Sequence, residues 1–403
     1  MEYWQIECRN AGKTGNLVPY PSFHYPIVAS LGRMKVMKAR AAILFAVGQK
    51  LDLREVEVES PKSGEVLIQM AAAGICHSDL HVMTGHLEAP LPVILGHEGS
   101  GIVAEVGPGV TSLKPGDHVI PLWRLSCGIC DYCSNGRPAL CAEGLQIRKT
   151  GRLLDGSTRF KLNGVEIKHF AGVSSFSEYS VLPAQAALKI PDDFPLDRAA
   201  LLGCGVITGV GAVFNAARVK PGSSVAIFGS GGVGVNVIQG AAIAGAEKII
   251  AVDLLANKLE FAKRFGATHT INAKEIEPVE AVRALTGGRG VDYAFEVIGL
   301  PVTIRQAFDS LSKRGLAVVV GLAPMTMEAS IPIIPLVFEE RSLMGSIYGS
   351  GRPRIDIPML INLYRAGKLK LDELLTGRYP FSQINEAYEA LERGEGLRSI
   401  VTF

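Results

Sequence analysis

The chain has 403 residues, with 41 lysines and arginines against 39 aspartates and glutamates, so its formal net charge is +2. At roughly 150 residues per domain, this length predicts two or three domains with a large buried core. The near-neutral charge excludes a typical nucleic-acid binder, and 48% hydrophobic residues exclude wholesale disorder. We find no apolar run near the roughly 18 residues of a membrane span and no signal peptide, so we expect a cytoplasmic protein without a membrane partner.

Seven cysteines are an odd number and too few for a disulfide scaffold in a chain of this length. Clustered cysteines in an intracellular protein are more often metal ligands or catalytic groups than disulfide partners. The 45 glycines are typical of an α/β protein with many tight turns.

The first residues lack a sustained periodicity, and we expect 1–37 to be a poorly ordered extension. Met34 and Met37 both precede the first regular segment, so an over-called start is the alternative. The region from Lys38 to about residue 205 is β-rich, with Gly/Pro turns between its strands. The expected strands are 41–47, 65–72, 101–106 and 118–121.

After residue 205 short strands alternate with helices, which predicts a parallel, doubly wound sheet. The expected strands are 224–228, 249–253, 292–297, 317–321 and 343–347, with helices at 234–244 and 257–265. The tail contains two expected helices, 357–366 and 384–393, and a last strand, 399–403.

One glycine-rich turn fits the dinucleotide-binding pattern G-x-G-x-x-G between a strand and a helix. Gly229 permits the tight turn, Gly231 lets the backbone approach a pyrophosphate, and Gly234 lets helix and strand pack closely. The helix N-terminus offers free N–H groups to the phosphates. The full turn contains Gly229, Ser230, Gly231, Gly232, Val233 and Gly234.

Asp253 ends the next strand, where its carboxylate can bond the ribose hydroxyls. This carboxylate would repel a 2′-phosphate, and Leu254 and Leu255 supply no arginine to bind one. The sequence therefore indicates NAD rather than NADP, with Lys258 as a further positive charge near the adenosine ribose.

Two groups of residues are candidate metal ligands. Four cysteines lie within 15 residues, a spacing that matches a closed structural zinc. Cys76, His97 and Cys204 could form an open zinc site, but spacing alone does not join residues so far apart, and a lone cysteine is more often a small buried hydrophobe. The four clustered cysteines are Cys127, Cys130, Cys133 and Cys141.

At these residues the chain resembles the zinc-dependent medium-chain alcohol dehydrogenases. The resemblance covers about residues 38–403 through its Cys76-His77-Ser78-Asp79, Gly96-His97-Glu98-Gly99 and Gly203-Cys204-Gly205 segments, the four-cysteine lobe and the glycine turn. It implies a GroES-like β-rich catalytic domain plus a Rossmann domain. The catalytic domain would comprise 38–205 and 348–403, with the zinc lobe at 127–141, and the NAD-binding domain 206–347.

The resemblance also implies roles for single residues. Cys76, His97 and Cys204 would bind the catalytic zinc, with Glu98 next to the metal and Asp79 orienting His97. Ser78 would pass the substrate proton through the NAD ribose to His81. The remaining implied contacts are His77 and Arg398 on the pyrophosphate, Thr208 and Val233 on the nicotinamide, Val320 and Ser346 on its carboxamide, and Trp123 in the substrate pocket.

The implied reaction is the oxidation of a primary alcohol, aliphatic or aromatic, to an aldehyde by hydride transfer to NAD, with zinc as a Lewis acid. Alternatives are an S-(hydroxymethyl)glutathione dehydrogenase, with Arg148 as an anion-binding arginine, and a nicotinoprotein that keeps its NAD. A zinc-independent quinone reductase would lack both zinc sites, and a structural NAD-binding protein would not need the Ser78–His81 relay. We also expect a homo-oligomer, dimer or tetramer.

Overall fold

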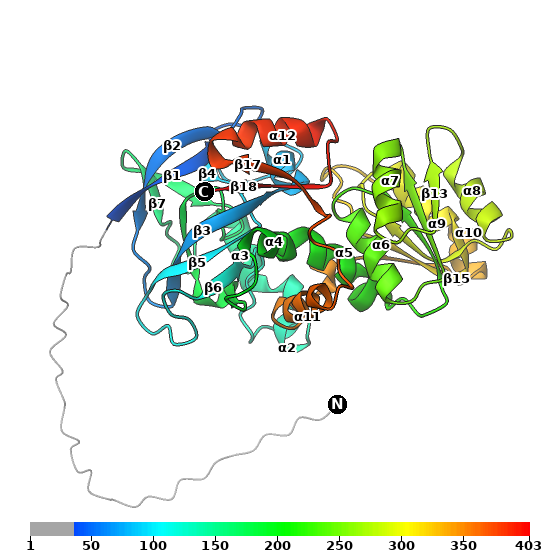
Figure 1. Cartoon of the computed structure of the whole chain (residues 1–403), viewed down its shortest axis with the longest axis horizontal. Helices are drawn as coiled ribbons and strands as arrows, with labels where there is room; N and C mark the ends of the chain where they lie inside the picture. The colour runs from blue at the N-terminus through cyan, green and yellow to red at the C-terminus, as the bar shows by residue number, and fades with distance from the viewer. Residues whose placement is uncertain (1–35) are drawn as a thin grey trace, which may run out of the picture. The chain divides into compact units, whose positions relative to one another are not determined.

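The computed structural model describes residues 36–403; most of the expected extension, including Cys8 and Met34, lies outside them. A β-rich part comes first, a parallel α/β part follows, and the chain then returns to the β-rich part (Figure 1). This arrangement confirms the fold class that the sequence predicts.

The β-rich part contains a closed barrel and a larger sheet. The C-terminal strand β18 (Arg398–Thr402) pairs with β3 (Glu65–Ile75), placing Ser399 opposite Ile75, next to Cys76. The barrel strands are β1 (Val36–Leu44), β2 (Asp52–Glu59), β7 (Phe160–Leu162), β8 (Val165–His169) and β4 (Val93–Ile94). The other sheet strands are β10 (Ala187–Lys189), β6 (His118–Pro121), β5 (Gly99–Val106), β17 (Leu375–Pro380) and β9 (Tyr179–Pro183).

The α/β part has six strands, and every neighbouring pair is parallel. All five residues of the central strand β11 are buried, as expected for a strand covered on both faces. The sheet order is β13 (His269–Asn272), β12 (Lys248–Asp253), β11 (Ser224–Phe228), β14 (Val291–Glu296), β15 (Leu311–Val319) and β16 (Ser342–Gly345). The helices are α6 (Gly234–Ile243), α7 (Ala256–Arg264), α8 (Pro278–Leu285), α9 (Pro301–Asp309) and α10 (Ile333–Phe338).

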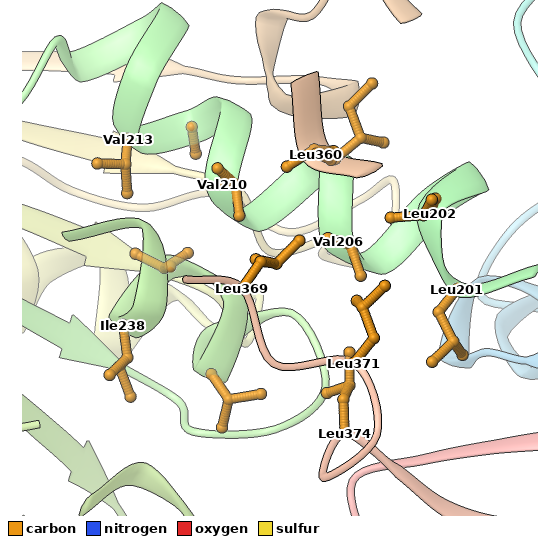
Figure 2. Packing of buried hydrophobic residues seen from close by; sticks show 14 of the residues in the cluster. Leu201, Leu202, Val206, Val210, Val213, Ile238, Leu360, Leu369, Leu371 and Leu374 are labelled. Atoms are coloured by element: carbon orange, nitrogen blue, oxygen red, sulfur yellow. The ribbon is translucent and has the colours of Figure 1, made fainter. Parts of the chain in front are cut away.

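Residues 196–217 form one helical stretch that is long and apolar enough to cross a membrane by length and composition. Our expectation that no such run exists is therefore wrong, although 78% of its most apolar window is buried inside the protein. Figure 2 shows Val206, Val210 and Leu369 in the hydrophobic cluster around it. The stretch consists of α4 (Leu196–Leu201), α5 (Ile207–Gly211) and the π-helical segments Leu202–Val206 and Ala212–Ala217.

This stretch also crosses residue 205, where the sequence suggests a domain boundary. Small residues let its α5 helix approach α6 closely, because a Cβ on Gly209 would lie 2.5 Å from the Asn236 Cβ. The same hydrophobic cluster contains residues from both predicted domains, including Leu201 and Ile238. Residues on both sides of the predicted boundary therefore pack in one core, and the domain limits themselves stay a prediction.

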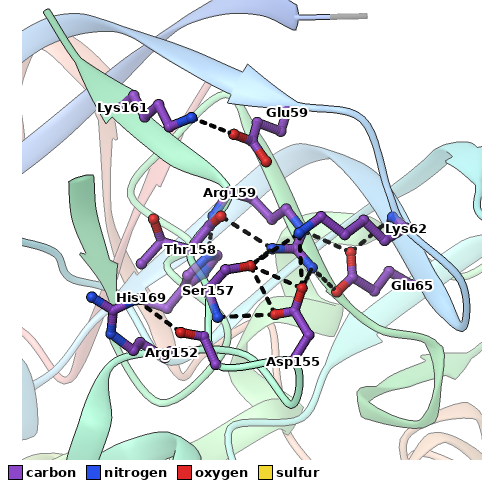
Figure 3. Close-up of polar contacts among 11 residues, drawn as sticks. Glu59, Lys62, Glu65, Arg152, Asp155, Ser157, Thr158, Arg159, Lys161 and His169 are labelled. Carbon is purple, nitrogen blue, oxygen red and sulfur yellow. Dashed lines mark hydrogen bonds and ion pairs between the residues drawn. The ribbon is translucent and has the colours of Figure 1, made fainter. Parts of the chain in front are cut away.

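Five further helices lie in the β-rich part and the tail, and their limits are given at the end of this paragraph. The segment between α3 (Ala142–Thr150) and β9 contains the buried Arg159, which donates to Glu65 at 2.9 Å and pairs with Asp155 at 2.9 Å (Figure 3). The pair of Arg159 with Glu65 attaches residues 144–176, which we call the insertion, to β3, the strand that leads to Cys76, whereas the pair with Asp155 lies within the insertion. The helices are α1 (His77–Met83), α2 (Asp131–Ser134), α3 (Ala142–Thr150), α11 (Pro353–Arg365) and α12 (Ile384–Glu392).

Several element limits differ from those expected. Strand β1 ends at Leu44 rather than at residue 47, because the chain leaves the barrel for a turn in which Gly48 has a φ of 80°. Strand β15 begins at Leu311, six residues before the expected start at 317, because Leu311 already pairs with Val291.

Candidate active site

Three elements bring together the residues that spacing alone does not connect. Cys76 lies between β3 and α1, His97 between β4 and β5, and Cys204 in the π-helical segment. Their ligand atoms all lie within 4.8 Å of one another, and His97 Nε2 is 3.2 Å from Cys204 Sγ. All three residues are buried. The tertiary structure therefore creates a compact cluster of two sulfurs and one imidazole nitrogen.

Buried charges orient this cluster. Asp79 Oδ2 lies 2.9 Å from His97 Nδ1, and Asp79 Oδ1 accepts a hydrogen bond from the Gly96 N–H at 2.9 Å. The hydrogen bond with Cys204 holds the pKa of the Cys76 thiol well below its usual range. Burial opposes protonation of His97, yet the negative charges of Asp79 and Cys76 raise its pKa to about 10. The cluster therefore favours a positive charge among its donor atoms.

These donors fit a zinc ion. Two thiolates and one imidazole form the ligand set known from alcohol dehydrogenase, which leaves one position open for a reactant. Asp79 on the far side of the His97 ring is the carboxylate partner that metal-bound histidines commonly have. His97 thus has one nitrogen directed at the cluster and the other fixed by Asp79.

Glu98 and Arg398 form a buried ion pair next to the cluster. The other Glu98 oxygen, Oε2, has no hydrogen-bond partner among the described residues. The stem of Arg398 packs on the dinucleotide turn, because a Cβ on Gly232 would lie 2.4 Å from its Cδ. The guanidinium thus contacts Glu98, whereas the expected contact of Arg398 with a pyrophosphate remains a prediction.

Helix α1 carries the residues of the predicted proton relay. Ser78 and His81 are half-buried, and His77 at the helix start is exposed. Burial, together with the nearby His86, lowers the pKa of His81. His81 Nδ1 lies 3.4 Å from the Nδ1 of the exposed His86, which sequence reasoning missed because a single histidine in a loop has no distinctive pattern.

The four clustered cysteines form a second group of possible metal ligands, with all four Sγ atoms within 4.8 Å of one another. The Cys130 N–H donates to Cys127 Sγ, and the Cys127 N–H donates to Cys141 Sγ, both at 3.4 Å. A hydrogen bond from the Ala142 backbone lowers the pKa of Cys130 to about 6, whereas burial raises that of Cys141 to about 11. Four sulfurs at this spacing fit a tetrahedral zinc.

The glycine turn between β11 and α6 has the backbone that its pattern predicts. Gly229 has a φ of 99°, in the left-handed region that favours glycine. A Cβ on Gly234 would lie 1.9 Å from the Gly229 carbonyl oxygen, so helix and turn tolerate only glycine there. A Cβ on Gly231 would meet nothing within 4 Å. Gly231 therefore leaves open space where a pyrophosphate could approach.

Three other predicted cofactor residues lie at the carboxyl ends of strands of the same sheet. Asp253 ends β12, and its carboxylate accepts from the Ser230 N–H at 2.7 Å and from the Leu255 N–H at 3.0 Å. Val320 directly follows β15 and Ser346 directly follows β16. Carboxyl ends of parallel strands form the usual ligand edge of such sheets. The other three predicted contacts are Thr208 on α5, Val233 just before α6, and Lys258 on α7, whose ammonium donates to the Gly396 carbonyl.

Aromatic side chains surround the buried cluster. The Trp123 ring lies edge-on to the His97 ring at 6.1 Å between centroids, and the Tyr348 ring lies 4.5 Å from Trp123. Phe170 meets His97 from another direction at 6.0 Å. The sequence singles out Trp123 but not the other two, because Tyr348 and Phe170 reach the site only through the tertiary fold.

Comparisons with known proteins agree with this geometry. Residues 62–192 match the alcohol dehydrogenase GroES-like domain, and residues 232–365 match the zinc-binding dehydrogenase family. The chain is 41% identical over 377 residues to the class-3 alcohol dehydrogenase of Cereibacter sphaeroides, covering 91% of this chain and 100% of that protein.

Two solved structures resemble the chain over nearly its whole length. The first is an alcohol dehydrogenase zinc-binding domain protein from Burkholderia ambifaria, 38% identical with a TM-score of 0.88, covering 92% of this chain and 100% of that one. The second is the benzyl alcohol dehydrogenase of Acinetobacter calcoaceticus, 36% identical with a TM-score of 0.87, covering 91% and 99%. The chain belongs to the zinc-dependent medium-chain alcohol dehydrogenase family, whose members use zinc and NAD(P).

Proposed function

We propose that this enzyme oxidises primary alcohols to aldehydes with NAD⁺, and reduces aldehydes in the reverse direction. The proposal is carried by the buried cluster of Cys76, His97 and Cys204 beside the aromatic wall of Trp123. Alcohol oxidation is the reaction named for two relatives that each cover 91% of this chain. The similarity to a benzyl alcohol dehydrogenase supports including aromatic alcohols among the proposed substrates.

Two zinc ions per chain are part of the proposal. Cys76, His97 and Cys204 would hold the first, and the four clustered cysteines would hold the second, which ties down a lobe with little core of its own. The first zinc would supply Lewis-acid chemistry to the alcohol oxygen, and the nicotinamide would accept the hydride.

The chain's own residues position the reactants and move the proton. Asp79 fixes the tautomer and orientation of His97, so that its Nε2 faces the cluster. Ser78 and His81 lie one helical turn apart on α1, and they would carry the alcohol proton outward. His81 is suited to this step because burial lowers its pKa, so it is neutral and able to accept a proton at neutral pH.

NAD rather than NADP is proposed because the Asp253 carboxylate stands at the end of β12, where the adenosine ribose is bound in such folds. The residues that follow it, Leu254 and Leu255, give no cation for a 2′-phosphate. We place the enzyme in the cytoplasm on its cysteine usage.

A second candidate activity is the oxidation of S-(hydroxymethyl)glutathione, which is consistent with the similarity to a class-3 alcohol dehydrogenase. The half-buried Arg148 would then bind the anionic end of that substrate. A nicotinoprotein would be recognised by NAD that stays with the purified enzyme. A structural NAD-binding protein would bind NAD without oxidising any alcohol.

The test is a panel of alcohols, aldehydes and S-(hydroxymethyl)glutathione, followed by NADH absorbance, with the metal content measured in parallel. We expect two zinc ions per chain and turnover of primary alcohols. Cys76→Ser should abolish turnover and leave one zinc, while the thermal unfolding temperature stays near that of the native enzyme. Retained turnover by this variant would refute the ligand assignment.

We also propose that the enzyme is a homo-oligomer. Within residues 36–403, the edge strand β16 pairs only with β15, which leaves its outer backbone groups free to pair with a second copy. The adjoining helix α10 exposes apolar side chains, with Ile333 71% and Phe338 79% exposed. An exposed apolar patch of this kind marks an interface. Analytical ultracentrifugation should show a dimer or tetramer for the native enzyme. Phe338→Glu should lower the sedimenting mass toward that of the monomer, and an unchanged mass would contradict the proposal that β16 and α10 form the interface.

A further inference from the structure

Three hydrogen-bond donors at the aromatic wall of the candidate active site are buried without a partner. The Trp123 Nε1, the Tyr348 hydroxyl and the Arg124 Nε make no hydrogen bond to any described residue. Tyr348 is 2% and Arg124 5% exposed. Unpaired buried polar groups are rare in folded proteins, because each loses its bonds to water without a replacement. Three of them in one place point to something that binds there.

The three groups form one cluster. The Trp123 and Tyr348 rings lie 4.5 Å apart, and the Arg124 guanidinium carbon lies 5.2 Å from the centre of the Trp123 ring. The Trp123 ring in turn meets the His97 ring edge-on at 6.1 Å. The side chains that carry the unpaired groups thus adjoin the reaction centre.

The chemistry of these three groups calls for a ligand that accepts hydrogen bonds. An indole and a guanidinium can only donate hydrogen bonds, and the Tyr348 hydroxyl donates when it is protonated. Arg124 is a buried cation with no carboxylate partner among the described residues, and the charge of the half-buried Arg148 acts on it. Buried charges are normally paired, so the Arg124 guanidinium requires a negative partner. The complementary group is an oxyanion.

The four-cysteine cluster offers another way to balance Arg124, because the Cys141 thiolate also acts on its charge. That role accounts for the arginine alone. It leaves the Trp123 and Tyr348 donors unpaired on the side of the reaction centre, whereas an oxyanion between the three groups accounts for all of them.

We propose that the preferred substrate carries an oxyanionic group, of which a carboxylate is the simplest, and that Arg124, Trp123 and Tyr348 bind it while the hydroxymethyl end reaches the zinc ligands. This inference rests on the proposed alcohol oxidation and adds the substrate class to it. A rigid aromatic or straight aliphatic spacer would join the two ends.

The experiment compares 4-(hydroxymethyl)benzoate with its methyl ester, which differ in charge at one end only. We expect the native enzyme to favour the carboxylate at least about tenfold in kcat/KM. Arg124→Met should lower this preference by about 10- to 100-fold, and Tyr348→Phe should lower it by a smaller factor, because it removes a neutral donor. Lys149→Met, at an exposed cation on the same helix as Arg148, should keep the native preference.

Binding of 4-methylbenzoate, which cannot be oxidised, is measured by calorimetry on the same zinc-loaded proteins. Weaker binding to Arg124→Met than to Lys149→Met supports the oxyanion site, and no binding to the native enzyme overturns it whether or not alcohols are oxidised. Turnover of both alcohols without preference for the carboxylate overturns the inference and leaves the proposed function intact. Loss of zinc from Arg124→Met with an unchanged preference assigns the arginine to the four-cysteine cluster instead.

Discussion

Substitutions at two glycines of the dinucleotide turn should have different effects, one on cofactor binding and the other on folding stability. Gly231 and Gly234 lie three residues apart, yet a Cβ on the first meets nothing within 4 Å, whereas a Cβ on the second meets the Gly229 carbonyl oxygen at 1.9 Å. Gly231→Ala should therefore fold normally and bind NAD⁺ poorly. Gly234→Ala should fail at the earlier step, because the new methyl strikes backbone that cannot move aside.

The magnitudes follow from these contacts. Gly231→Ala should change the free energy of unfolding by no more than about 0.5–1 kcal/mol, and the loss of chain entropy in the unfolded state favours the variant. A methyl group in the path of the pyrophosphate should cost about 1–3 kcal/mol of binding, which is about 5- to 150-fold in Kd. Gly234→Ala should lower the unfolding free energy by about 1–3 kcal/mol or more.

The assays are denaturant unfolding without cofactor and titration of NAD⁺ by calorimetry, each on the native enzyme and both variants. If Gly231→Ala binds NAD⁺ as tightly as the native enzyme, the pyrophosphate does not approach this turn and the cofactor site is elsewhere. If Gly234→Ala is as stable as the native enzyme, the close approach of helix and turn is not required for the fold.

Three further substitutions test the relay, the cofactor preference and the insertion. His81→Gln should slow alcohol oxidation most near neutral pH, with recovery at higher pH as hydroxide takes the proton; a uniform loss in the pH profile would remove His81 from the relay. Asp253→Gly should raise the kcat/KM ratio of NADP⁺ to NAD⁺, and an unchanged ratio would mean that another group contacts the ribose. Glu65→Leu should lower the unfolding free energy by about 3 kcal/mol, because it removes a partner of the buried Arg159. The exposed pair of Lys38 and Glu55 supplies the control, because Glu55→Gln should leave stability nearly unchanged in the same unfolding assay.

Local signals in the sequence predicted five of the six strands of the α/β part and the helices α6 and α7, but they did not predict β13, α8, α9 or α10. The glycine turn, Asp253 and the four clustered cysteines each depend on residues that are close in the chain, so their spacing carries the information. Strand β11 and helix α6 start at the expected residues because glycines mark the junction between them. The helical stretch at 196–217 was missed because small and apolar residues without a clear period give no amphipathic signal.

Spacing along the chain therefore predicted a dinucleotide site and a four-cysteine zinc site. The family resemblance supplied the ligands of the catalytic zinc, which the residues alone left open. Only the tertiary structure brings Cys76, His97 and Cys204 together. The pairing of β3 with β5 places Ala73 opposite Gly99, and the packing of the helical stretch brings Cys204 to His97, 107 residues away in the chain. The tertiary structure also placed Tyr348 against Trp123 and left their donors unpaired. Such contacts depend on long-range packing, which no local pattern of residues encodes.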